Sequence, residues 1–185
     1  MSDDAPPQKG NFKRAIPEGD DRERLVCVDC GFINYENPKI VVGSVVHEDG
    51  KILLCRRAIN PRKGYWTLPA GFMEQNETAM EGAMREAFEE ATAKIEIEAL
   101  LAVYSIPRLS QVQLIYRAHL SSPGIAPGPE SEEVGFFAFD EIPWTELAFP
   151  SVHWALGHHR AVAGETHFPP FVNPHGEVGD LKAGL

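Results

Sequence analysis

The chain has 185 residues, of which 43% are hydrophobic, and this suits one domain with a sizeable core. Its 27 acidic and 17 basic side chains give a formal net charge of −10, which disfavours binding to a long nucleic acid but not to a small anionic substrate. With three cysteines, no apolar run near the roughly 20 residues that cross a bilayer and no signal-peptide pattern, we expect a cytoplasmic protein that does not enter a membrane.

The first 36 residues are expected to form two short segments. Residues 1–24 are polar and contain Pro and Gly, which favours a flexible N-terminal arm. Cys27 and Cys30 then form a CxxC, so residues 25–36 are interpreted as the remnant of a zinc-ribbon knuckle. A structural zinc site needs four ligands and no cysteine precedes Cys27, so structural Zn²⁺ is not expected. The two cysteines of this degenerate ribbon are then ordinary small hydrophobic residues or free thiols.

A β-hairpin is predicted next in the chain. Residues 40–46 are β-branched and almost continuously apolar, which is typical of a strand buried on both faces. Asp49-Gly50 predicts a tight turn, after which residues 52–55 return as the partner strand. Arg56 and Arg57 end that strand and face opposite sides of the sheet, so at most one points into a site. We assign Arg56 to substrate binding.

A helix is predicted from Glu77 to Thr92, because nothing between them breaks a helix and Asn76 can serve as the N-cap. Three carboxylates of this helix lie three and four residues apart, which places them on one face: Glu86, Glu89 and Glu90. Taken alone, this face is either a solvated acidic surface or a set of oxygen ligands for Mg²⁺ or Mn²⁺.

The stretch from Gly71 to Ala93 resembles the Nudix box, GX5EX7REUXEEXGU, where U is a bulky aliphatic residue. The matching positions are Gly71, Glu77, Arg85, Glu86, Glu89 and Glu90. The departures are Ala87 and Ala93, which are small for U positions, and Thr92, which replaces the final Gly. That Gly would end the helix in a left-handed conformation, so Thr92 leaves the termination of the helix open.

The resemblance implies a mixed α/β fold, the Nudix α/β/α sandwich, over residues 37–163, with a C-terminal tail at 164–185. Further strands are predicted at 94–106, 111–120 and 134–139, and a last helix is predicted from Ser151 to about Ala163. The likeness extends to zinc-ribbon-bearing NADH, FAD and ADP-ribose pyrophosphatases. The NADH signature SQPWPFPxS is replaced by YSIPRLSQ at residues 104–111, which argues against a strict NADH preference.

The resemblance also implies roles for individual residues. Glu86 and Glu90 would be metal ligands, and Glu89 would ligate the metal or polarise the attacking water. Arg85 would hold Glu77 in register, and Ala70 would offer its backbone carbonyl to the metal. Glu130, or second to it Glu133, would supply a further carboxylate that acts as ligand or base; the alternative is a solvated acidic loop.

For the substrate, Phe72 and Tyr104 are the predicted stacking surfaces, with the core as the alternative for each. The loop at 121–133 is predicted to form one wall of the pocket. His153, His158 and His159 are interpreted as exposed helix residues and not as metal ligands. A homodimer remains compatible with the sequence.

Together these features predict a Mg²⁺- or Mn²⁺-dependent enzyme that cleaves the phosphoanhydride of a nucleoside diphosphate linked to another group. Substrates of this class resemble ADP-ribose, FAD or NAD(H), and AMP would be one product. Three alternatives stay open: a nucleotide sensor that does not cut its ligand, a hydrolase of nucleoside triphosphates, and a zinc-ribbon interaction protein.

Overall fold

A computed structural model describes residues 10–180, which form two compact units, up to Asn37 and from Pro38 onward. The first unit is a three-stranded antiparallel sheet in the order β1-β2-β3: β1 (Phe12–Ala15), β2 (Arg24–Cys27) and β3 (Ile33–Asn34). Strand β1 falls within the expected flexible arm and pairs with β2, where Phe12 lies opposite Cys27. The part of that arm at residues 1–9 lies outside the described residues.

The second unit is built on a seven-stranded mixed sheet. Its strands are β4 (Lys39–Glu48), β5 (Lys51–Arg57), β6 (Trp66–Thr67), β7 (Ala70–Phe72), β8 (Ile95–Ile106), β9 (Gln111–Leu120) and β10 (Ser131–Ala138). The main path runs β10-β5-β4-β9-β8, while β6 pairs with β5 and β7 pairs with β4. Strands β4 and β9 are parallel, and the other strand pairs of the sheet are antiparallel.

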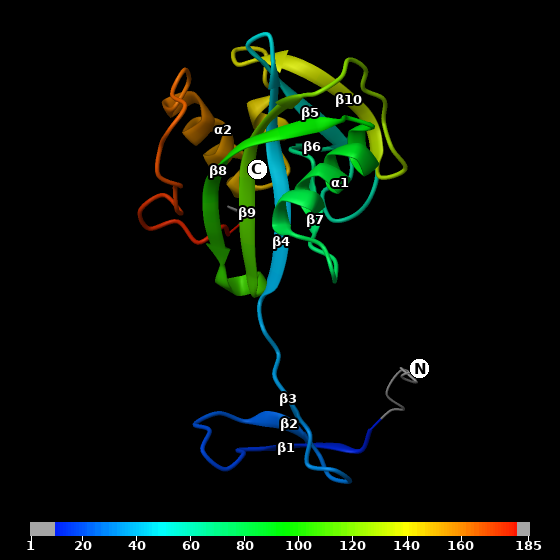
Figure 1. Cartoon of the computed structure of the whole chain (residues 1–185), viewed down its shortest axis with the longest axis vertical. Helices are drawn as coiled ribbons and strands as arrows, with labels where there is room; N and C mark the ends of the chain where they lie inside the picture. Colours follow the sequence, from blue (N-terminus) through cyan, green and yellow to red (C-terminus); the bar gives the residue numbers. More distant parts are fainter. Residues whose placement is uncertain (1–9, 181–185) are drawn as a thin grey trace. The chain divides into compact units, whose positions relative to one another are not determined.

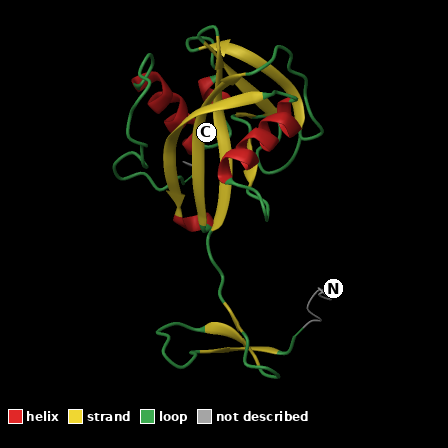
Figure 2. Cartoon of the chain, in the orientation of Figure 1, coloured by secondary structure: helices red, strands yellow, loops and turns green. Residues whose placement is uncertain are grey.

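Two helices cover the sheet from opposite faces, as Figures 1 and 2 show. Helix α1 (Ala79–Ala91) packs mainly against β4 and β7, and α2 (Pro150–Ala161) packs mainly against β8 and β4. Two short 3₁₀ helices, η1 (Pro107–Leu109) and η2 (Trp144–Glu146), complete the unit. The predicted α/β/α sandwich with a mixed sheet is therefore confirmed.

Strand β4 is buried on both faces because its side chains alternate between the two helical layers. Val46 packs in one core cluster with Ala87 and Ala91 of α1. Val45 packs in the other cluster with Ala155 and Leu156 of α2. This central position explains why the strand is nearly continuously apolar, and it makes β4 the reference from which both faces of the sheet are positioned.

The start of α1 differs from its prediction by two residues. Thr78, and not Asn76, is the N-cap: its hydroxyl accepts from the backbone N–H of Glu81, whose side chain accepts from the backbone N–H of Thr78. Asn76 instead adopts a left-handed conformation with φ of 67° in the preceding turn. Both residue types can cap a helix, and the reciprocal pair formed with Glu81 favours Thr78.

The start of α2 also needs a correction. Helix α2 begins at Pro150, its N-cap residue is Phe149, and no side chain caps it, so the predicted cap Ser151 lies inside the first turn. Proline suits this place because its fixed φ matches a helix and its missing N–H would have had no partner there. From the end of α2 to residue 180 the chain is irregular, with one isolated bridge between Phe171 and Ala102.

Candidate active site

The acidic face of α1 lies against strand β7, with its carboxylates at different depths. Glu86 and Glu90 are only 8% and 6% exposed, whereas the side chain of Glu89 is 56% exposed. The backbone N–H of Ala70 donates to Glu90 Oε2 at 3.1 Å. Two carboxylates are thus inside the protein and the third meets solvent beside them, which is not the arrangement of a solvated acidic surface.

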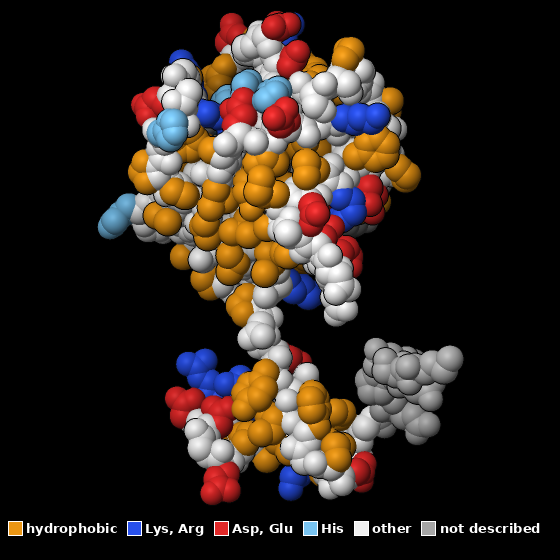
Figure 3. Space-filling model, viewed as in Figure 1, with side chains coloured by type: hydrophobic (Ala, Val, Ile, Leu, Met, Phe, Trp, Pro, Cys, Tyr) orange, Lys and Arg blue, Asp and Glu red, His pale blue; other side chains and the backbone are white. Residues whose placement is uncertain are grey.

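Arg85 ties these carboxylates to the turn before the helix. Its Nε and Nη2 donate to the two oxygens of Glu77, each at 2.9 Å, in a bidentate pair. Its Nη1 donates to Glu86 at 2.7 Å and to Glu89 at 3.0 Å, and Nη2 also donates to the carbonyl of Phe72. We call Glu77, Glu86, Glu89 and Glu90, with Arg85, the carboxylate cluster. Figure 3 shows acidic and basic side chains together over α1.

The carboxylate cluster holds its members in different protonation regimes. The hydrogen bonds from Arg85 and from the backbone N–H of Glu74 lower the pKa of Glu77 to about 2. Burial raises the pKa of Glu90 to about 8, with further contributions from the negative charges of Glu86 and Glu130. Burial likewise raises the pKa of Glu86 against the opposing effect of Arg85. Because the pKa values of Glu86 and Glu90 stay raised, the guanidinium of Arg85 does not fully compensate the negative charge of the carboxylate cluster.

Two glycines allow the backbone to approach the carboxylate cluster closely. A Cβ added to Gly71 would overlap the carboxylate of Glu86, and one added to Gly128 would overlap the backbone carbonyl of Glu89. Gly71 thus leaves space for the Glu86 side chain, and Gly128 lets the loop after β9 pass over the end of α1.

The loop at 121–133 is attached to the C-terminal end of α1. The backbone N–H groups of Ala126 and Gly128 donate to the carbonyls of Ala91 and Glu90, at 2.9 and 3.0 Å. Thr92 ends the helix in the left-handed conformation that Gly would have adopted, with φ of 48°, and its hydroxyl donates to the carbonyls of Ala91 and Ala126. The loop therefore satisfies the free carbonyls of the helix end, which is a structural role.

Glu130 follows directly from this tethered loop. Its backbone carbonyl accepts from the N–H of Ala58 at 2.8 Å, and its charge raises the pKa of both Glu86 and Glu90. The other candidate of this loop, Glu133, instead pairs with Arg56 across β10 and β5, with Nη1 and Oε2 at 3.7 Å. Of the two, Glu130 is the one that acts electrostatically on the carboxylate cluster.

The two arginines at the end of β5 point to opposite faces, as expected. Arg56 donates to the carbonyl of Gly64 and lies near the carboxylates of Glu132 and Glu133. Arg57 follows Leu53 and Cys55, which pack in the cluster that α1 covers, and its positive charge lowers the pKa of Glu90. The assignment of Arg56 to substrate binding stays a prediction, and Arg57 is a second candidate because it follows Leu53 and Cys55 at a period of two along the strand.

The two predicted stacking residues lie in different environments. Phe72 is 47% exposed at the edge of the carboxylate cluster, with the ammonium of Lys39 5.0 Å from its ring centroid. Tyr104 is fully buried, and its hydroxyl lies 2.7 Å from Nδ1 of His158. A core ring offers no surface to a base, so the assignment of Tyr104 to substrate stacking is corrected, while that of Phe72 stays a prediction.

The donor set of the carboxylate cluster suits a hard divalent cation. Three carboxylates offer oxygen atoms of the kind such a cation prefers, two of these carboxylates are buried, and Glu130 adds negative charge. Within residues 10–180, no three acidic, histidine or cysteine side chains are already gathered in the geometry of a metal site. Instead, Arg85 occupies oxygens of Glu86 and Glu89, so a bound cation would take over part of that role.

Comparisons with known proteins agree with this geometry. Profiles of the NUDIX domain and of the Nudix N-terminal zinc ribbon match residues 37–155 and 9–36. The chain is 34% identical over 119 residues to the ADP-ribose pyrophosphatase of Methanocaldococcus jannaschii, covering 62% of this chain and 69% of that protein. It is 37% identical over 102 residues to a MutT-like protein of Streptomyces ambofaciens, covering 55% and 64% of the two chains.

A solved structure extends the likeness over both units. The crystal structure of a NUDIX hydrolase from Nitrosomonas europaea is 46% identical in sequence, with a TM-score of 0.83. The match covers 89% of this chain and 94% of that one. Separately, no helix among the described residues is both long enough and apolar enough to span a bilayer.

Proposed function

The chain belongs to the NUDIX family and is a Nudix hydrolase, and from that premise we propose that its carboxylate cluster cleaves the phosphoanhydride of a nucleoside diphosphate linked to a second group. ADP-ribose is the first candidate substrate, followed by FAD and NAD(H)-like compounds, with AMP as one product. The observation that carries the proposal is the pair of buried carboxylates, Glu86 and Glu90, beside the half-exposed Glu89.

The protein residues divide the work as follows. Glu86 and Glu90, with the carbonyl of Ala70, would hold Mg²⁺ or Mn²⁺, which screens the substrate phosphates and makes bound water more acidic. Glu89 has the exposure that a general base needs, because its carboxylate reaches both solvent and the cluster. Water would attack phosphorus as the bridging oxygen leaves. Arg85 keeps Glu86 and Glu89 in register through Glu77 and the carbonyl of Phe72.

The substrate class rests on two supports. The first is the likeness to an ADP-ribose pyrophosphatase over 119 residues. The second is the place of Phe72, an exposed ring directly beside Gly71 and the carboxylate cluster, where a base or sugar attached to the diphosphate can pack. Arg56 and Arg57, the last two residues of β5, are candidates for phosphate or ribose contacts.

A triphosphate hydrolase is the second candidate, since the chain is also similar to a MutT-like protein. The experiment is a panel of ADP-ribose, FAD, NADH, nucleoside triphosphates and capped dinucleotides, each with Mg²⁺ or Mn²⁺ and scored by product. We expect ADP-ribose to give AMP and ribose 5-phosphate, with kcat/KM at least about tenfold above that of any triphosphate, a difference of about 1.4 kcal/mol in transition-state binding.

The outcomes separate the competing functions. A triphosphate with a higher kcat/KM than every dinucleotide would overturn the substrate class and leave the carboxylate chemistry standing. Binding of ADP-ribose without turnover of any compound would indicate a nucleotide sensor. A Glu89→Gln variant should still bind the substrate but turn it over much more slowly. Its binding signal is the reference for a protein that binds ADP-ribose without rapid cleavage.

A further inference from the structure

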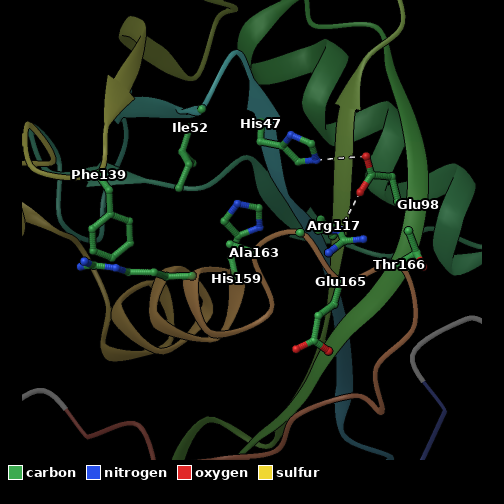
Figure 4. A pocket seen from close by; sticks show the side chains of 12 residues that line it. His47, Ile52, Glu98, Arg117, Phe139, His159, Ala163, Glu165 and Thr166 are labelled. Atoms are coloured by element: carbon green, nitrogen blue, oxygen red, sulfur yellow. Dashed lines mark hydrogen bonds and ion pairs between the residues drawn. The ribbon is translucent and has the colours of Figure 1, made fainter.

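A second polar site lies on the face of the sheet that α2 covers, where a cavity has a volume of about 690 Å³. Figure 4 shows the side chains that line it. The cavity is bounded by the β4–β5 hairpin, by β8 and β9, and by the end of α2 with the residues that follow it. Its principal lining residues are His47, Ile52, Glu98, Arg117, Phe139 and His159. We call it the histidine cavity. Its volume falls within the range of about 300–1,000 Å³ that is usual for small-molecule sites.

Glu98 is the centre of a satisfied polar network in this cavity. Its Oε2 accepts from Arg117 Nε at 2.6 Å, and its Oε1 lies 3.0 Å from His47 Nε2 and 3.1 Å from His119 Nδ1. Burial opposes ionisation of Glu98, but the hydrogen bonds from His47 and Arg117 outweigh it and lower its pKa. Arg117 is itself 8% exposed and also packs on the ring of Phe168. The carboxylate of Glu98 is therefore already neutralised by its neighbours.

His159 is the member of the cavity whose polar group is not satisfied. Its Nδ1 is buried and has no hydrogen-bond partner within the described part of the chain. Its ring centroid lies 5.4 Å from that of His47. Burial, and then the positive charges of His47 and Arg117, lower its pKa to about 4, and the negative charge of Glu98 only partly offsets them. The electrostatic potential at His159 is therefore positive, which disfavours a further positive charge and favours a negative one. The interpretation of this residue as an exposed helix histidine was wrong.

We propose that the histidine cavity binds the phosphate group of a small phosphomonoester between His47, His159 and Arg117. These three side chains come from α2, β4 and β9, so they approach from three directions, which suits a tetrahedral anion better than a planar carboxylate. Ile52 and Phe139 form an apolar wall for the organic part of the ligand. A cation is disfavoured, because the guanidinium of Arg117 already holds Glu98.

Binding of this anion should take up protons. A phosphate beside His159 favours the charged form of that imidazole, which burial otherwise disfavours. The other charged groups around the cavity are Glu96, which lies 3.8 Å from His119, Arg160, which stacks on Phe139, and Glu165. The carboxylate of Glu165 points away from both imidazoles (Figure 4), so it does not compete for them.

The test measures binding of inorganic phosphate and of phenyl phosphate to the full chain, with a chelator present so that the carboxylate cluster cannot bind phosphate through a metal. Titrations followed by the imidazole NMR signals report binding at the cavity itself. The test variant is His47→Asn combined with His159→Phe. The matched control is His153→Phe, which changes a histidine of the same helix outside the cavity, and thermal unfolding confirms that each variant folds.

We expect phenyl phosphate to bind more tightly than inorganic phosphate, because Ile52 and Phe139 offer its ring an apolar wall. The double variant should lose at least about tenfold in affinity, and the control should not. Equal binding to the double variant and to the unchanged protein would overturn the proposal. So would phenyl phosphate that binds no more tightly than inorganic phosphate, or no binding of either probe.

Discussion

The carboxylate cluster and the histidine cavity are both built around β4, on opposite faces of one sheet, yet their charges are arranged differently. On the α1 face the guanidinium of Arg85 bonds three carboxylates, those of Glu77, Glu86 and Glu89, and burial raises the pKa of Glu86 and Glu90. On the α2 face Glu98 is matched by Arg117 and two imidazoles, and it is the neutral His159 that lacks a partner. Buried carboxylates without enough positive partners favour binding of a cation. A carboxylate that already has partners, beside an imidazole that has none, favours binding of a proton or an anion.

The largest effect that separates the two sites is removal of divalent metal. Exhaustive chelation should abolish hydrolysis, because the carboxylates of the cluster repel the substrate phosphates when no cation lies between them. Mg²⁺ or Mn²⁺ should restore the rate, as measured by AMP release. Turnover that survives chelation would remove the cation from the α1 face and with it the contrast between the sites.

The second test replaces the exposed carboxylate of the cluster. Glu89→Gln should lower kcat by roughly 10²–10⁴, the usual range for loss of a general base, and leave the melting temperature nearly unchanged, since Glu89 is half-exposed. Glu146→Gln, at an exposed site in η2, is the matched control. An unchanged rate would move the base function elsewhere, and Glu130 would be the first residue to test.

The third test concerns how the carboxylates are held. Arg85→Lys keeps the charge but loses the bidentate pair with Glu77 and the shared contacts to Glu86 and Glu89, so kcat/KM should fall by about 10–100-fold. Steady-state kinetics with ADP-ribose measures this, and Arg108→Lys, at an exposed ion pair, is the control. A variant as active as the parent protein would show that helix geometry alone aligns the carboxylates.

The fourth test uses acid to act on the α2 face. His159 binds protons less readily when folded, because burial lowers its pKa to about 4, below the usual imidazole value of about 6.5. As the pH falls from about 6.5 to 4, the unfolded chain takes up a proton before the folded one, so stability present above this range is lost within it. After allowance for solvent screening, the loss should be on the order of 1–3 kcal/mol.

Urea unfolding at several pH values across this window measures that loss. His159→Phe should remove this part of the pH dependence, and replacement of the exposed His175 by Asn should not. If the His159→Phe variant lost stability across this pH range in parallel with the parent protein, the imidazole of His159 would not be the group that acid titrates.

The smallest expected effect concerns the first unit. Elemental analysis should find well below one zinc per chain, because Cys27 and Cys30 supply two of four ligands and the facing strand β1 places Phe12, and not a cysteine, opposite Cys27. One zinc per chain would contradict this. One zinc per two chains would indicate a site shared between two copies.

The helix, its carboxylates and the buried strand could be predicted from the sequence because each depends on local periodicity. Glu86, Glu89 and Glu90 share a face at helical spacing, and within the predicted strand the buried residues 42–46 alternate between two covered faces. The choice between Asn76 and Thr78 as the cap was also local, since Glu81 stands three residues after Thr78 and completes a capping box.

The environments of single side chains were not predictable in the same way, because they depend on pairing across the fold. Tyr104 became a core residue because α2 packs over β8, and the loop at 121–133 became part of the end of α1 through hydrogen bonds about 35 residues apart in sequence. The histidine cavity brings residues from β4, β9 and α2 together, and the sequence spacing of residues 47, 117 and 159 does not predict that they meet.

The alternation of β4 has a consequence for how the length of this chain can vary among related proteins. Val46 faces α1, while its neighbours Val45 and His47 face α2. An insertion or deletion of one residue within β4 would turn every following side chain to the other face and would disrupt the carboxylate cluster and the histidine cavity together. We therefore expect substitutions, but no indels, within β4, and differences in length confined to the Asp49-Gly50 turn that follows it.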